Sequence, residues 1–180
     1  MNAPTTHVGP HHEASDHTRS WRDYIPLLAL VFVSLLTASA LKYSYGPGVP
    51  PVRWMHGFMG FCLIAFALLK LVDLPGFANG FQRYDLLARH SRAYALAYPF
   101  IELALGLGYI AFWRPTTVYL ATFLLLGFGL LGVINALRRG LDVNCACMGS
   151  TLKVPLSTVA VVENGGMALM ALAMWLRVQL

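Results

Sequence analysis

Residues 116–137, TTVYLATFLLLGFGLLGVINAL, form an apolar run that contains no charged side chain. A transmembrane α-helix needs about 20 consecutive apolar residues, so this run alone is long enough to cross a bilayer. A second apolar run, residues 95–112, precedes it, and only Trp113, Arg114 and Pro115 separate the two. A connection this short makes the two spans antiparallel neighbours. The fold is therefore predicted to be built on a hairpin of two membrane-spanning helices.

Three further apolar runs flank this hairpin, over residues 24–41, 54–72 and 155–177. Each is long enough, or nearly so, to cross the hydrocarbon core of a membrane. We therefore predict an all-α fold for residues 24–180, a polytopic membrane helix bundle of about five transmembrane helices.

The segment between the second and third spans is expected to add a short interfacial helix near residues 78–90. Its apolar residues recur three or four positions apart, and its polar residues take the other side of the same helical wheel. The apolar edge consists of Phe77, Phe81, Tyr84 and Leu87, and the polar side of Gln82, Arg83, Asp85 and Arg89.

Composition supports the membrane class and argues against nucleic-acid binding. The 180 residues are 57% hydrophobic and 12% charged, with a mean hydropathy of +0.60. Soluble domains carry roughly 25% charged residues. The net charge is +5, but the basic residues sit beside the apolar runs rather than on one amphipathic face. We interpret them as topology signals and expect lipid, not nucleic acid, as the partner.

Residues 1–23 are polar and rich in proline and histidine, which predicts a disordered tail. The histidines are His7, His11, His12 and His17. Imidazole suits copper, nickel and zinc, so these side chains either bind a transition metal or belong to a simple solvated tail. No small-residue cleavage site stands out before Tyr43, and we expect the first apolar run to remain in the mature protein.

The polar break after residue 137, RRGLDVNCACMGS over residues 138–150, holds Cys145 and Cys147. A disulfide across one intervening residue closes a small, strained ring that is easily reduced, which suits a carrier of oxidising equivalents. The same two thiolates with the thioether of Met148 are soft donors suited to Cu(I). The pair is thus a candidate for thiol–disulfide exchange or for metal binding. Cys62, in the second span, is expected to stay a free, buried thiol.

Glu102 and Glu163 fall near the centres of their spans, and Asn164 follows the second of them. A charged side chain at this depth costs about 2.5 to 3.5 kcal/mol on insertion scales, so both carboxyls are expected to face the bundle. They either form a proton or cation site between the third and fifth spans or supply interhelical hydrogen bonds, Glu163 with Asn164 and Glu102 with a tyrosine such as Tyr98. Lys70, near the end of the second span, is expected to snorkel to the interface.

Five stretches resemble the MauE branch of the MauE/DoxX redox-associated membrane proteins. They are 69–77 (LKLVDLPGF), 84–88 (YDLLA), 98–103 (YPFIEL), 145–149 (CACMG) and 154–158 (VPLST). The resemblance covers roughly residues 54 to 180 and implies a small helix bundle in the bacterial inner membrane. The cysteine pair of the family corresponds to Cys145 and Cys147, and its acidic position in the third span to Glu102. The tail and Met148, where relatives often have Phe or Leu, depart from the family pattern.

The resemblance also implies a role, because this family is linked to maturation of the disulfide-rich small subunit of methylamine dehydrogenase beside a thioredoxin-like partner. The leading hypothesis is a membrane redox accessory without a bound cofactor that exchanges dithiol and disulfide equivalents through Cys145 and Cys147. Whether it is itself an enzyme stays open. The alternatives are a Cu(I) or heavy-metal membrane protein that uses Cys145, Cys147 and Met148, and a non-catalytic assembly scaffold. The positive-inside rule favours a cytoplasmic cysteine turn, whereas disulfide donation to exported proteins requires the other side, so the orientation is left open.

Overall fold

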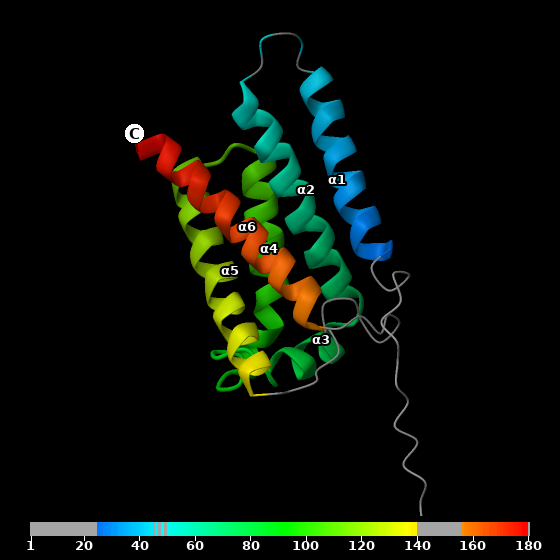
Figure 1. Ribbon diagram of the computed structural model, residues 1–180, viewed down its shortest axis with the longest axis vertical. Helices are drawn as coiled ribbons and strands as arrows, with labels where there is room; N and C mark the ends of the chain where they lie inside the picture. Colours follow the sequence, from blue (N-terminus) through cyan, green and yellow to red (C-terminus); the bar gives the residue numbers. More distant parts are fainter. Residues whose placement is uncertain (1–24, 45, 47, 49, 140–155, 180) are drawn as a thin grey trace, which may run out of the picture.

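The computed structural model describes residues 25–44, 46, 48, 50–139 and 156–179, and these residues form an all-helical bundle (Figure 1). The helices are α1 (Ile25–Ser44), α2 (Pro51–Val72), α3 (Leu74–Phe81), α4 (Arg92–Ile110), α5 (Pro115–Arg138) and α6 (Leu156–Gln179). Within this part of the chain, 5 helices are long and apolar enough to span a membrane, and α3 is the short exception. The predicted fold class is therefore confirmed. The tail, Cys145 and Cys147 lie outside the described residues.

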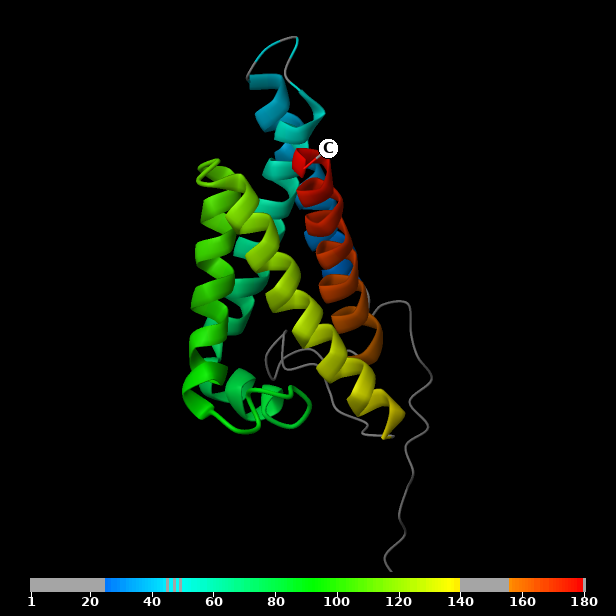
Figure 2. The ribbon, with the colours of Figure 1, turned by 90° about the vertical axis from the view of Figure 1, so that its left-hand side faces the viewer.

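The five long helices alternate in direction, and α3 lies across one end of the bundle (Figures 1 and 2). That end, which we call the α3 end, also holds the end of α2, the start of α4, the end of α5 and the start of α6. α2 packs mainly along α4, and α5 packs mainly along α6. The bundle thus consists of two helix pairs joined side by side, with α1 added against α2.

Proline and short polar side chains set where the helices begin. Pro51 and Pro115 occupy the first turns of α2 and α5, where a missing N–H leaves no hydrogen bond unmade. The side chains of Asp73 and Ser91 cap α3 and α4 by accepting hydrogen bonds from backbone N–H groups three residues later. Because Pro51 favours the helical start, α2 begins three residues before the span that hydropathy predicted.

The short helix lies earlier than predicted, and the prediction that it includes Asp85 and Leu87 was wrong. α3 ends at Phe81, and turns follow it, in which Asp85 Oδ1 accepts hydrogen bonds from the N–H groups of Leu87 (2.9 Å) and Ala88 (2.8 Å). These turns break the helical phase on which the prediction rested. Asp85 is consequently 0% exposed and Leu87 45% exposed. Phe77, Phe81 and Tyr84 are buried in the bundle.

Glycine allows α2 and α4 to pack closely. A Cβ at Gly60 would lie 2.9 Å from the carbonyl oxygen of Gly106, and one at Gly106 would lie 3.0 Å from that of Gly60. Helices in a membrane gain affinity from such approach because lipid is as apolar as their side chains. α1 is more peripheral: 17% of its apolar window is buried, against 50% for α2. α1 therefore contributes less to the buried core of the bundle than α2 does.

Candidate functional site

Three charged side chains from three different helices meet inside the bundle near the α3 end. Lys70 of α2 donates hydrogen bonds to both carboxyl oxygens of Glu102 on α4 (2.8 and 2.7 Å) and to Oε1 of Glu163 on α6 (2.9 Å). Lys70, Glu102 and Glu163 are 2%, 0% and 4% exposed. We call these residues the buried charge cluster. The prediction that both glutamates face the bundle is confirmed.

The prediction that Lys70 snorkels to the interface was wrong. Its position in the last turn of α2 suggested that the ammonium could reach the membrane surface. Instead α3 folds back across this end, and its Phe77 ring lies 6.0 Å from Lys70 Nζ. The rings of Tyr98 (5.3 Å) and Phe66 (5.8 Å) also lie beside the ammonium. An ammonium enclosed by aromatic faces and two carboxyls gains cation–π and ionic contacts in place of water.

The polar partners of the glutamates also differ from the expected ones. Glu102 pairs with Lys70 rather than with Tyr98, and Glu163 shares the same ammonium rather than depending on Asn164. Asn164 is nevertheless buried on the same helix. The hypothetical Cβ of Gly129 on α5 lies 3.6 Å from both the Asn164 amide nitrogen and the Tyr98 hydroxyl, so this glycine leaves room for both groups.

Of the three cysteines, Cys62 is among the described residues. Cys62 lies two helical turns before Lys70 on α2 and is a buried, free thiol, as predicted. Cys145 and Cys147 lie outside the described residues, so their proposed chemistry is not tested by the geometry. The helices that they connect, α5 and α6, end and begin at the α3 end. Among the residues described here, no group of three or more His, Cys, Asp and Glu side chains could hold a metal ion.

A second buried polar cluster surrounds His56 on α2, and the sequence analysis missed it. His56 Nδ1 lies 2.9 Å from the Tyr109 carbonyl oxygen and therefore carries the donated proton, while Nε2 accepts from the Tyr119 hydroxyl. The ring stacks on Phe112 at 3.8 Å between centroids. A cavity of about 50 Å³ beside it is also lined by Arg53. The only sequence signal was a histidine inside an apolar run, which does not reveal its partners.

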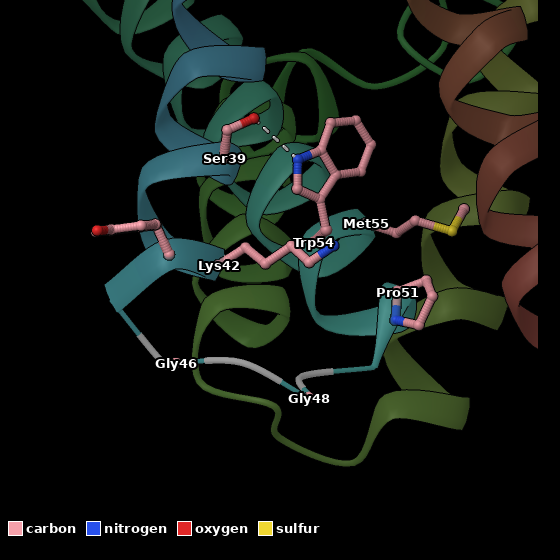
Figure 3. Close-up of a pocket in the computed structure, with 8 residues that line it drawn as sticks. Ser39, Lys42, Gly46, Gly48, Pro51, Trp54 and Met55 are labelled. Carbon is pink, nitrogen blue, oxygen red and sulfur yellow. Dashed lines mark hydrogen bonds between the residues drawn. The ribbon is translucent and has the colours of Figure 1, made fainter.

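A groove of about 1020 Å³ opens at the end of the bundle opposite α3 (Figure 3). Its lining residues are Ser39, Lys42, Tyr43, Gly46, Gly48, Pro51, Trp54 and Met55. The Trp54 indole N–H donates to the Ser39 hydroxyl at 3.2 Å, which joins α1 to α2 beside the groove. Tryptophan, tyrosine and lysine at a helix end are typical of the boundary between lipid and water. The groove lies at the other end of the bundle from the buried charge cluster.

Comparison with known proteins gives a family for the chain. Residues 49–177, from just before α2 to near the end of α6, match the family described as "Methylamine utilisation protein MauE". A "Methylamine utilization protein MauE" of Paracoccus denitrificans is 32% identical over 129 residues, which cover 69% of this chain and 68% of the relative. The protein of the same name from Paracoccus versutus is 31% identical over 126 residues, 68% of each. No solved structure matches the chain at a significant level. The match contains all three residues of the buried charge cluster and leaves out α1.

Proposed function

The chain belongs to the MauE family, and from this premise we propose that it serves methylamine utilisation as a redox accessory protein of the bacterial inner membrane. Cys145 and Cys147 pass dithiol and disulfide equivalents between a thioredoxin-like protein and a client, such as the small subunit of methylamine dehydrogenase. A thiolate of the pair attacks a disulfide of one partner, and the second thiolate resolves the mixed disulfide. In each exchange one dithiol is oxidised and one disulfide is reduced, so no further electron acceptor is needed.

The observation that carries this proposal is the place of the cysteine-bearing connection in the chain. α5 ends and α6 begins at the α3 end, and Cys145 and Cys147 fall between these two helices in the sequence. A thiol pair there is attached to a membrane-fixed frame yet belongs to a polar segment, which suits exchange with proteins that approach from the aqueous phase. Arg138 and Arg139 at the end of α5 add positive charge near the pair, and positive charge favours the reactive thiolate.

Trapping the mixed disulfide tests the proposal. In the Cys147→Ser variant, Cys145 cannot be released by its neighbour, so we expect a stable adduct with a purified thioredoxin-like protein on non-reducing gels. Cys62→Ser is the matched control and should form no more adduct than wild type. If Cys147→Ser yields no adduct with the thioredoxin-like protein or the client subunit, the exchange mechanism is refuted.

Two further measurements separate this function from metal binding. The first is a titration against a glutathione series, in which reduced cysteines are alkylated and counted by mass spectrometry. Mild thiol buffers should reduce the Cys145–Cys147 disulfide but not structural disulfides, whose reduction potentials lie below about −300 mV. Retention of Cu(I) by the purified protein, lost when both cysteines of the pair become serine, would instead select metal binding. The same labelling with a membrane-impermeant reagent on intact spheroplasts would report which side the pair faces.

A further inference from the structure

We propose that Lys70, Glu102 and Glu163 form a binding site for one exchangeable proton inside the membrane-spanning part of the bundle. This site is separate from the cysteine pair and does not depend on the thiol chemistry proposed above. It rests on the charge balance of the cluster, on one unpartnered oxygen and on the position of α3.

The charge balance of the cluster is uneven. Two carboxylates and one ammonium give a net charge of −1, and no member of the cluster is more than 4% exposed. An uncompensated charge in such surroundings is strongly unfavourable even after the surroundings relax. Two carboxyls that share a buried site therefore do not both ionise readily, and their protons belong to the pair rather than to either residue. One additional proton makes the cluster neutral.

The geometry leaves one oxygen of the pair open to that proton. Both oxygens of Glu102 accept hydrogen bonds from Lys70, whereas Glu163 uses only Oε1. Glu163 Oε2 is buried and has no hydrogen-bond partner among the described residues. An unpartnered carboxylate oxygen is far more costly to bury than an unpartnered hydroxyl, so Oε2 of Glu163 is the oxygen of the pair that is open to the shared proton.

The surroundings supply no second cation within the described part of the chain. Cys62 of α2 and Tyr98 of α4 lie near the charged groups, and the Phe77 ring of α3 lies beside the ammonium. Asn164 of α6 and Gly129 of α5 lie next to Tyr98, and Ser34 of α1 lies beside Cys62. All of these are neutral at ordinary pH. Within the described residues, the charge state of the cluster is consequently set by its own three members.

The site lies close to water, behind a short helix. Lys70 is in the last turn of α2, and α3, with only 8 residues, covers this end through Phe77 and Phe81. Local opening of one short helix at the end of a bundle costs less free energy than unfolding of the whole bundle. Opening of α3 would connect Glu163 to the aqueous phase at the α3 end, which makes the proton exchangeable.

Infrared difference spectroscopy of the full-length protein in lipid nanodiscs tests the proposal directly. A protonated carboxyl has a carbonyl band separate from that of a carboxylate, and the band shifts in D2O when its proton exchanges. We expect wild type to keep one such glutamic-acid band at about pH 7, where a solvent-exposed glutamate with a pKa near 4.3 is ionised. Isotope labelling of glutamate distinguishes this band from that of the buried Asp85.

The variants make the test specific to charge balance. Glu163→Gln and Glu102→Gln each leave a neutral pair with Lys70, so either change should abolish the band. Lys70→Met should double it, because two carboxyls then need protons. Asp85→Asn, which removes a buried carboxyl outside the cluster, should leave it unchanged. Absence of the band from wild type, its failure to shift in D2O, or its survival in either glutamine variant would overturn the proposal. If Lys70→Met does not fold, the two glutamine variants still decide.

Discussion

Replacing Lys70 by methionine should destabilise the bundle more than any other single change at a charged position. The side chain makes three charge-assisted hydrogen bonds of 2.7 to 2.9 Å to carboxyls on two other helices. Removing one partner of a buried ion pair costs about 3 to 5 kcal/mol, because the other charge is left uncompensated. Two carboxyls lose their partner here, and methionine fills the volume without satisfying either, so a loss of at least about 3 kcal/mol is expected.

The assay is reversible unfolding in mixed micelles of increasing SDS fraction, followed by circular dichroism. Lys42→Met is the matched control, because Lys42 is an exposed lysine in the last turn of α1 and its loss should change the free energy of unfolding by less than about 1 kcal/mol. Changing Lys70, Glu102 and Glu163 together to methionine should restore most of the stability, since apolar replacement of a whole buried ion group is often neutral or stabilising by about 1 to 4 kcal/mol. A Lys70→Met variant as stable as wild type, or a triple variant no more stable than the single one, would refute the reasoning.

Three further changes test other parts of the structure. Gly106→Ala places a Cβ 3.0 Å from the α2 backbone and should lower the free energy of unfolding by about 1 to 3 kcal/mol, whereas Gly127→Ala, which meets nothing within 4 Å, should not; the same SDS titration compares them. Burial raises the pKa of Asp85 above its usual 3.8, and backbone N–H donors only partly oppose this, so the folded state binds more protons than the unfolded state. Stability should then fall as pH rises from about 3.8 through the raised pKa, and Asp85→Asn should flatten that slope in unfolding curves recorded across acidic pH. Tyr119→Phe leaves Nε2 of the buried His56 without its donor and should cost about 1 to 3 kcal/mol by thermal unfolding, with no effect on the infrared band of the charge cluster.

The spans were predictable because each one depends only on its own residues. An apolar run such as residues 116–137 must become a helix in lipid, where every backbone polar group needs an internal partner. The inward orientation of Glu102 and Glu163 followed from the same energetics. The spans and the inward orientation of the two glutamates could be predicted without knowing which helices pack against each other.

The partner of those glutamates depended on contacts between distant parts of the chain, which one sequence does not reveal. Lys70 lies 32 residues before Glu102 and 93 before Glu163, so pairing them requires knowing that α2, α4 and α6 meet near the α3 end. The prediction that Lys70 snorkels failed because it assumed that the end of α2 is exposed to water, whereas α3 covers it. The burial of Asp85 was missed for a local reason, since hydrogen bonds in a turn replaced the helical register that the pattern assumed.

The separation of these partners along the chain has a consequence for how the protein is made. Ribosomes add roughly 5 to 20 residues per second, so α2 is complete some 2 to 6 s before Glu102 is synthesised and roughly 5 to 20 s before Glu163 is. During that interval the Lys70 ammonium has no carboxyl to bind, and its place in the last turn of α2 lets it stay in the headgroup region. It moves inward only when α4 and then α6 arrive. A nascent chain stalled before α4 would therefore present an unneutralised lysine, a feature by which membrane quality control distinguishes an unfinished bundle from a finished one.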